Sequence, residues 1–162
     1  MRIGVVGDTH NNMRSIEKII EIFEQCGVDR VVHTGDVTQP KVLDALSRLS
    51  MPVCGVYGNN DQGERPGLDE SAARHGMEWA PVPLEVEWGG RRILIVHDPL
   101  DLEKHLGPHH DLALHGHTHL YRHEEVDGAR VFNPGECAGM MVGQNRVGLV
   151  DLASLQCEIE YF

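Results

Sequence analysis

Short apolar segments of this chain end repeatedly in a glycine followed by a side chain that can bind a metal ion. Asp8 follows RIGVVG, Asp36 follows VVHTG and Asn59 follows VYG. Apolar residues at helical spacing lie between these segments, so the order is strand, helix, strand, helix, strand. Such an order predicts parallel strands joined by right-handed crossovers. Ligands of open α/β sheets bind beyond the carboxyl ends of the strands, so we expect the three side chains at one edge.

Two helices are expected between these strands. The first has Asn11 or Asn12 available as its N-cap, and Gly27 is placed to end it. Its apolar residues at helical spacing are Met13, Ile16, Ile19, Ile20 and Phe23. A second, short helix is expected around residues 40–49, where the residues on one side are Val42, Leu43, Leu46 and Leu49.

The second half of the chain has the pattern of strands and hairpins. Gly89-Gly90 separates two apolar runs, and Asp127-Gly128 is a hairpin signal between two more. Residues 146–152 and 157–162 fit closing strands, and residues 62–75 fit a loop followed by a short helix. The simplest assembly is an α/β fold of two mixed sheets packed face to face, with helices outside. No linker or repeat divides residues 1–162, so a single domain is expected.

Charge and hydropathy exclude several classes of partner. The chain has 14 Lys and Arg against 25 Asp and Glu, a net charge of −11, and an acidic surface repels nucleic acid. No apolar run is long enough to span a bilayer, and the N-terminus lacks the pattern of a signal peptide. We therefore expect a cytoplasmic protein that binds neither membranes nor nucleic acid non-specifically. The four cysteines form no CxxC pair, which favours free thiols.

Histidines complete the set of candidate metal ligands. His97 ends the run ILIVH, and His117 and His119 follow LALHG. The whole set is Asp8, His10, Asp36, Asn59, His97, His117 and His119. Oxygen and imidazole donors without thiolates suit two first-row divalent ions that share one carboxylate, among them Mn²⁺, Fe²⁺, Ni²⁺ and Zn²⁺. Two such ions activate a water and clamp a phosphoryl group, so the residues predict phosphoester hydrolysis.

The motifs GDTH, GD, GNND and GHTH, with His97 between the last two, resemble the calcineurin-like metallophosphoesterase superfamily. The short chain and the NPGE segment at 133–136 resemble its compact bacterial and archaeal phosphodiesterase branch. The resemblance implies a four-layer α/β/β/α sandwich, the metallo-dependent phosphatase-like fold. It also implies a metal-dependent phosphodiesterase in which a hydroxide bridging two divalent ions, with Mn²⁺ expected first, attacks a small phosphoester.

The resemblance divides the candidate ligands between two ions. The first ion would be held by Asp8, His10, Asp36 and His119. The second would be held by Asp36, Asn59, His97 and His117, so that Asp36 bridges the pair. Alternation along an extended GHTH segment would turn both of its histidines to one side, where they would reach different ions.

Four further positions lie near the motifs. Asn60 stands where many family members have a His that protonates the leaving group, a role worth roughly 10²–10⁴ in rate. An amide is no acid, so activated leaving groups, another acid or the metals alone are the alternatives. Glu136 stands where the resemblance implies a side chain with a small hydroxyl. A carboxylate there would either repel a substrate anion or accept a hydrogen bond from metal-bound water. Asp61 is a candidate to orient Asn59 or a histidine, and His33 is a candidate to support Asp36. For each of the two residues, a purely structural role is an equal alternative.

Other functions share these ligands. A phosphomonoesterase or nucleotide-polyphosphate hydrolase would use the same site, because the pocket walls decide the substrate. A non-catalytic metal-binding scaffold is the rival of a different class, since a retromer subunit uses this fold with a decayed site; seven filled positions favour the enzyme. The physiological substrate, the native metal and the oligomeric state stay open. Trp79, Trp88 and Met140-Met141 fit either core packing or a contact between copies.

Overall fold

The computed structural model describes residues 1–162 and contains two mixed β-sheets. The first sheet has, in spatial order, β11 (Gln156–Tyr161), β10 (Arg146–Asp151), β1 (Arg2–Val6), β2 (Arg30–His33), β3 (Val53–Val56) and β4 (Glu78–Ala80). Strands β1 to β4 are parallel, and β10 and β11 extend the sheet antiparallel beyond β1. The predicted parallel run is therefore confirmed.

The second sheet is built mainly from the hairpins. Its spatial order is β5 (Leu84–Trp88), β6 (Arg91–Ile95), β7 (Leu112–Leu114), β9 (Ala129–Asn133) and β8 (Arg122–Val126). Hairpins join β5 to β6 and β8 to β9, whereas β6, β7 and β9 are parallel. Gly89 and Gly90, and Asp127 and Gly128, have positive φ in the two turns, as their hairpin signals require.

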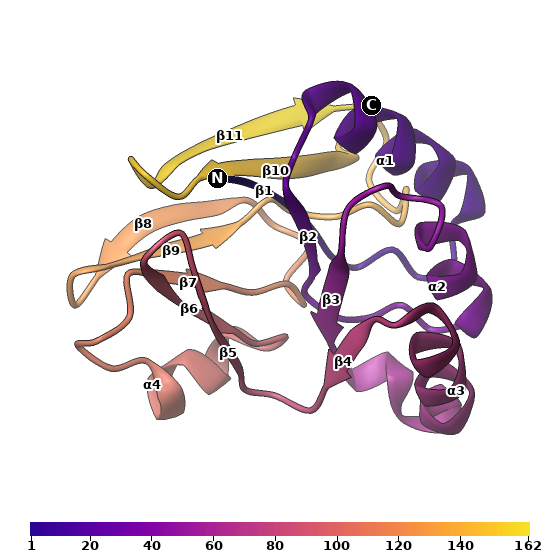
Figure 1. Cartoon of the computed structure of the whole chain (residues 1–162), viewed down its shortest axis with the longest axis horizontal. Coiled ribbons are helices and arrows are strands. Elements are labelled where there is room, and N and C mark those ends of the chain that lie inside the picture. Colours follow the sequence, from indigo (N-terminus) through magenta and orange to yellow (C-terminus); the bar gives the residue numbers. More distant parts are fainter.

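Helices cover the outer faces of both sheets (Figure 1). The helices are α1 (Met13–Cys26), α2 (Pro40–Leu46), α3 (Arg65–His75) and α4 (Leu102–His105), with 3₁₀ turns η1 (Asn59–Glu64) and η2 (Pro99–Asp101). The side chain of Asn12 accepts from the backbone N–H of Ser15 and so caps α1, and Gly27 ends it in the left-handed conformation. Helices α1, α2 and α3 lie against the first sheet, and α4 against the second.

Three apolar layers hold the sheets and helices together. One lies between α1, α2 and α3 and the first sheet, where Ile16, Ile19 and Phe23 are fully buried. The central layer joins the two sheets and includes Val5 and Val32 from the first. A smaller layer packs Leu102 of α4 on the outer face of the second sheet. The four-layer α/β/β/α sandwich predicted from the sequence is confirmed.

The segment 62–75 is more helical than predicted. Helix α3 takes up its last eleven residues, with Pro66 in its first turn, and η1 precedes it directly. The sequence signal is weak because only Leu68, Ser71 and Ala72 of this helix are buried. Strand β4 and helix α4 are too short for the periodicity of the sequence to indicate them.

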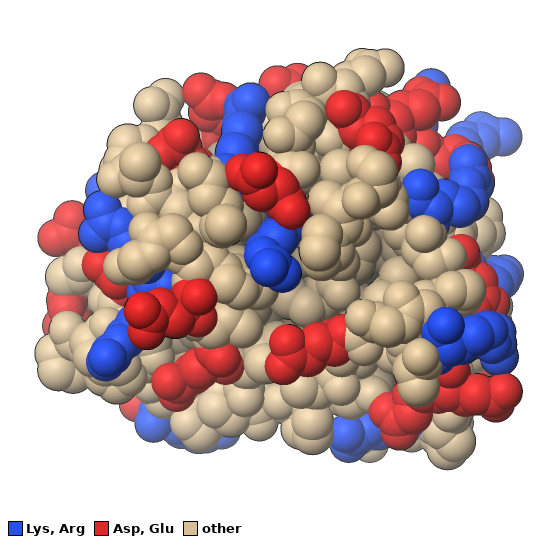
Figure 2. All heavy atoms as spheres, viewed as in Figure 1, with Lys and Arg blue, Asp and Glu red and all other residues tan.

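Neither tryptophan forms a large exposed apolar surface, because both side chains are partly buried. Trp79 packs against the layer under α1, α2 and α3, and Trp88 against the layer between the sheets. Met140 is 63% exposed, so it is not a core residue and is accessible for a contact between copies. Figure 2 shows acidic and basic side chains interspersed on one face, without a continuous basic surface. None of the helices has the length and apolar character needed to cross a bilayer.

Candidate active site

All seven predicted ligands lie in loops that follow parallel strands. Those after β1, β2 and β3 come from the first sheet, and those after β6 and β7 from the second. The two sheets face each other, so these loops meet at one end of the sandwich. The rule that ligands bind beyond the carboxyl ends of parallel strands thus accounts for where the seven side chains gather.

Five of the seven residues have left-handed backbone conformations. The φ angles are 51° at Asp8, 41° at His10, 58° at Asp36, 67° at His117 and 59° at His119. Residues other than glycine rarely adopt this conformation, and it gathers where the surrounding contacts impose it, often at functional sites. The GHTH segment is therefore not the extended strand that the sequence predicted, and tight turns rather than alternation orient its two histidines.

Close approach of the loops explains two glycines of the motifs. A Cβ atom on Gly58 would lie 2.1 Å from Oδ1 of Asp36, and one on Gly35 would lie 2.6 Å from Nδ1 of His97. Any side chain at either position would push the loops apart. In the sequence, each of these glycines directly precedes a candidate ligand. The structure shows which atoms occupy the space that a side chain would need.

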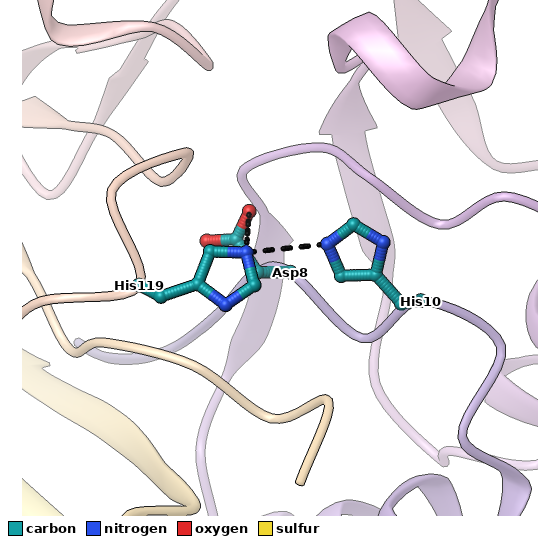
Figure 3. A group of neighbouring side chains, drawn as sticks. All are labelled: Asp8, His10 and His119. Carbon is teal, nitrogen blue, oxygen red and sulfur yellow. Dashed lines mark hydrogen bonds and ion pairs between the residues drawn. The ribbon is translucent and has the colours of Figure 1, made fainter. Parts of the chain in front are cut away.

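Asp8, His10 and His119 form one group of neighbouring donors, which we call the Asp8 group (Figure 3). Nε2 of His10 lies 3.3 Å from Nε2 of His119, and the latter lies 3.8 Å from Oδ1 of Asp8. Oδ2 of Asp8 is buried and has no hydrogen-bond partner. Ligand atoms bound to one ion at about 2.1 Å are roughly 3.0–4.2 Å apart, depending on the angle between them, so this spacing fits a metal site.

Asn59, His97 and His117 form the second group, the Asn59 group. Oδ1 of Asn59 lies 2.9 Å from Nε2 of His97 and 2.9 Å from Nδ1 of His117, and these two nitrogens are 3.3 Å apart. Nδ1 of His97 donates to the backbone carbonyl of Thr34 over 2.9 Å, which leaves Nε2 to face the other atoms. His117 and His119 thus belong to different groups.

Asp36 lies between the two groups. Its Oδ2 is 3.5 Å from Nε2 of His10 and 3.4 Å from Nε2 of His97. Burial opposes ionisation of Asp36, but contacts with His97 and Asn60 outweigh it and hold its pKa well below the usual range. Burial likewise opposes protonation of His97, but its contact with Asp36 prevails and raises its pKa. The carboxylate is therefore ionised, and its Oδ2 lies near a histidine of each group. Asp8, Asp36 and His97 also form a set of possible ligands whose atoms all lie within 4.8 Å of one another.

The donor atoms are better arranged to bind divalent ions than to form hydrogen bonds with one another. Nε2 of His97 faces two acceptors, Asp36 Oδ2 and Asn59 Oδ1, and also His117 Nδ1. A positive charge among these atoms stabilises them, and burial makes an unsatisfied acceptor costly. In the other group, the buried Oδ2 of Asp8 has no hydrogen-bond partner and is likewise stabilised by a nearby positive charge. Oxygen and imidazole ligands of this kind suit first-row divalent metals.

His33 and Asp61 support the loops rather than the donors directly. Nδ1 of His33 accepts from Gly35 N–H over 3.1 Å, so its Nε2–H donates to Thr9 Oγ1, also over 3.1 Å. Burial lowers the pKa of His33 to about 3, so the ring is neutral. The carboxylate of Asp61 accepts from the backbone N–H groups of Asp36, Gly58 and Thr38, at 3.0, 2.7 and 2.7 Å. Its hydrogen-bond partners are backbone groups, not the side chain of Asn59 or a histidine.

Asn60 occupies the position of the leaving-group acid and faces Asp36. Its backbone N–H donates to Asp36 Oδ1 over 2.9 Å, and its side-chain amide donates to Oδ2 over 2.8 Å. Both bonds favour the ionised carboxylate. Asn60 therefore holds the shared carboxylate in place, a contact that the sequence did not indicate.

Glu136 is a buried carboxylate directly behind His119. Its Oε2 lies 3.3 Å from Nδ1 of His119, and its Oε1 accepts from Met141 N–H over 2.6 Å. These two contacts give Glu136 a third role beside the two predicted ones, because its fully buried carboxylate lies behind His119. In the same segment the amide of Asn133 donates to Gly116 O and Thr118 Oγ1, so it holds the GHTH loop.

A third group of potential ligands, Glu85, His109 and His110, lies in a separate cavity that none of the seven residues lines. Nδ1 of His110 accepts from Gly107 N–H over 3.0 Å, so the proton of the neutral ring is on Nε2. That nitrogen is the one that faces Glu85, at 3.6 Å. A protonated nitrogen binds no metal, and this group is therefore a poor metal site.

A cavity of about 320 Å³ opens beside the Asn59 group and is lined by both Asn59 and His97. Arg65, on its wall, lies over the ring of Tyr57 at 4.2 Å and forms no salt bridge. The carboxylates of Asp98 and Asp101 also line this cavity, and Asp101 is paired with Lys104 at 2.7 Å. Arg65 is thus a positive charge without a counter-ion next to the site, and no sequence motif marked it.

Comparison with known proteins places the chain in a family. A model of the calcineurin-like phosphoesterase superfamily domain matches residues 1–155. Phosphodiesterase MJ0936 of Methanocaldococcus jannaschii is 35% identical over 156 residues, which cover 93% of each chain. Phosphodiesterase YfcE of Escherichia coli is 26% identical over 152 residues, or 83% of this chain and 78% of that protein.

Solved structures show the same relationship. The structure of an archaeal phosphodiesterase superposes with a TM-score of 0.90 at 32% identity, over 100% of both chains. Vps29 of Entamoeba histolytica has a TM-score of 0.67 at 21% identity, over 100% of this chain and 99% of its own, and shares the fold alone. The match over nearly all residues, together with the two donor groups around Asp36, shows that the chain belongs to the calcineurin-like phosphoesterase superfamily.

Proposed function

We propose that this protein is a phosphodiesterase that uses two divalent metal ions, held by the Asp8 group and the Asn59 group and bridged by Asp36. The observation that carries the proposal is the position of Asp36 Oδ2, within 3.5 Å of His10 Nε2 and 3.4 Å of His97 Nε2. A single oxygen in contact with both groups is what a shared ligand requires. The similarity to the phosphodiesterases MJ0936 and YfcE supports the substrate class.

Each residue has a part in preparing the site. When bound, the two ions supply an acidified water as nucleophile and positive charge for the phosphoryl oxygens. Asn60 and Asp61 hold the side chain and backbone of Asp36 by hydrogen bonds, so the shared carboxylate stays ionised and oriented. His33 ties Thr9, between Asp8 and His10, to the loop that carries Asp36. The site is therefore organised before substrate arrives.

The leaving group receives no proton from Asn60. An amide is no acid, and the backbone N–H and the side-chain amide of Asn60 each donate a hydrogen bond to Asp36. We therefore expect good leaving groups, such as aryl alcohols, to react fastest. The cavity beside Asn59 and His97 is proposed to hold one organic arm of the diester, with Arg65 facing an arm that carries negative charge.

The metal and the surroundings of the protein are finer predictions. We expect Mn²⁺ to support activity, since oxygen and imidazole ligands accept it readily, with Fe²⁺, Ni²⁺ and Zn²⁺ as alternatives. The single domain, the cytoplasmic location and the lack of non-specific nucleic-acid binding stay predictions from composition. A phosphomonoesterase would use the same donors, and a non-catalytic metal-binding scaffold is the alternative of a different class.

Hydrolysis of model esters tests the function. Metal-free protein is titrated with Mn²⁺ while it hydrolyses bis-p-nitrophenyl phosphate or p-nitrophenyl phosphate. The proposal predicts metal-dependent hydrolysis that favours the diester. Preference for the monoester would indicate a phosphomonoesterase, and two bound ions without hydrolysis of either ester would favour a scaffold.

A further inference from the structure

We propose that Glu136 is a positioning residue that fixes the proton of His119 on Nδ1 and thereby presents Nε2 to a metal ion in the Asp8 group. This inference rests on the proposed function for its metal ions, but it concerns a residue for which neither the motifs nor the comparisons give a role. It predicts that Glu136 sets the metal affinity of one group of donors and leaves the other unaffected.

The geometry gives His119 one tautomer. Oε2 of Glu136 lies 3.3 Å from Nδ1 of His119, and a carboxylate only accepts, so Nδ1 carries the proton. The lone pair of Nε2 then points towards Nε2 of His10 at 3.3 Å and Oδ1 of Asp8 at 3.8 Å, as Figure 3 shows. This is the nitrogen that a metal in the Asp8 group would need.

The carboxylate has no other ionic partner. Glu136 is 0% exposed, and the nearby guanidinium of Arg146 lies over the rings of Tyr121 and Tyr161 instead. A buried charge is costly unless it is paired and hydrogen-bonded, so the bond from His119 is the contact that makes this anion tolerable. A carboxylate behind a ligating histidine orients the ring and raises its basicity.

Glu136 also connects His119 to the loop after β9. Its Oε1 accepts from Met141 N–H over 2.6 Å, in a loop where Asn145 Oδ1 accepts from Gly139 N–H over 2.9 Å. The two oxygens of Glu136 therefore both act as acceptors. A glutamine has one oxygen and one NH₂ group, so it either loses Met141 or donates to Nδ1 and moves the proton of His119 to Nε2.

Calorimetric titration of metal-free protein with Mn²⁺ tests this role without any substrate. The variants are Glu136→Gln, Glu136→Ser and, as a matched control, Asn145→Ala, which loosens the same loop without touching His119. We expect Glu136→Gln and Glu136→Ser to weaken one of two binding steps about 10–100-fold, the usual effect of losing such a partner, and to leave the other unchanged. Asn145→Ala should leave both steps unchanged. Unchanged binding in both Glu136 variants would overturn the proposal, as would equal weakening in the control.

The tautomer itself is a second, independent test. Nitrogen-15 NMR of the metal-free protein at pH 8, with His119 assigned from His119→Ala, should show the proton on Nδ1 in the wild type. In Glu136→Gln the proton should move to Nε2 where the amide oxygen keeps the bond from Met141 N–H. A wild-type proton on Nε2 would overturn the proposal even if a variant failed to fold. Protein that binds two Mn²⁺ ions but hydrolyses no phosphoester would contradict the proposed function and leave the role of Glu136 standing.

Discussion

The two donor groups around Asp36 use similar side chains but different support. In the Asp8 group, His119 has the buried carboxylate of Glu136 behind it at 3.3 Å. In the Asn59 group, His97 has a neutral backbone carbonyl behind it, at 2.9 Å, and the oxygen donor beside it is a neutral amide. His117 has the carboxylate of Asp98 near its Nε2, but this contact is longer, at 3.9 Å, and Asp98 is partly exposed. Buried negative charge therefore accumulates on the Asp8 side. The difference teaches that residues outside the motifs decide how strongly each half of a symmetric-looking site holds its metal.

The largest effect is expected where both groups are damaged together. Asp36→Asn removes the shared negative charge, so hydrolysis of bis-p-nitrophenyl phosphate should fall by about 10³-fold or more, while the thermal unfolding temperature changes little. Asp127→Asn, in the turn between β8 and β9, is the matched control and should keep full activity. Wild-type turnover by Asp36→Asn would remove the basis for a shared ligand.

Adding charge to the weaker group should make the two groups more alike. Asn59→Asp places a carboxylate beside His97 and His117, which should tighten one Mn²⁺ binding step on the order of tenfold, about 1.4 kcal/mol. Turnover should decrease, because a second carboxylate leaves the metals less acidic. Calorimetric titration measures the first effect, and an unchanged affinity would mean that ligand charge does not distinguish the groups.

Acidity should disturb the support of the Asp8 group. Burial lowers the pKa of His33 to about 3 from 6.5, so between these values the unfolded chain binds a proton that the folded protein does not. The free energy of unfolding of metal-free protein should therefore decrease as the pH falls below 6.5, by at most about 1.4 kcal/mol per pH unit from this residue. Urea unfolding at pH 7 and pH 5 measures it. His33→Gln should show a shallower pH dependence, and an identical slope would contradict the assignment.

The smallest effect is expected on the open side of the Asn59 group. Arg65→Ala should raise KM about fivefold, about 1 kcal/mol, for a diester with a negatively charged arm, because Arg65 has no other counter-ion. The change for bis-p-nitrophenyl phosphate should be smaller. Arg74→Ala, which removes an exposed arginine paired with Asp44 and Glu70, is the control. Equal KM values for both variants would exclude a role for Arg65 in binding.

Much of the fold was predictable because its signals are local. Apolar runs ending in glycine identified β1, β2 and β3, and the Gly89-Gly90 and Asp127-Gly128 turns identified two hairpins. Parallel strands place their ends at one edge, so the meeting of the candidate ligands followed from the same pattern. Helix α3 was underestimated because its buried surface is small and its apolar periodicity correspondingly weak.

The contacts that distinguish the two groups were not predictable from the pattern. The partner of Glu136 depends on how a loop after β9 folds back towards His119, and no local signal encodes that distance. Asp61 binds three backbone N–H groups because the loop of Asp36 is left-handed, which the residue types alone do not reveal. The proposed role of Arg65 in substrate binding rests on its lack of a counter-ion, which is a property of the folded surface and not of the sequence pattern.

The most direct test of the account is a crystal structure grown with Mn²⁺ and examined by anomalous scattering. Two peaks are expected, one in contact with Asp8, His10 and His119 and the other with Asn59, His97 and His117, with Asp36 touching both. A single peak, or two ions that do not share Asp36, would contradict it.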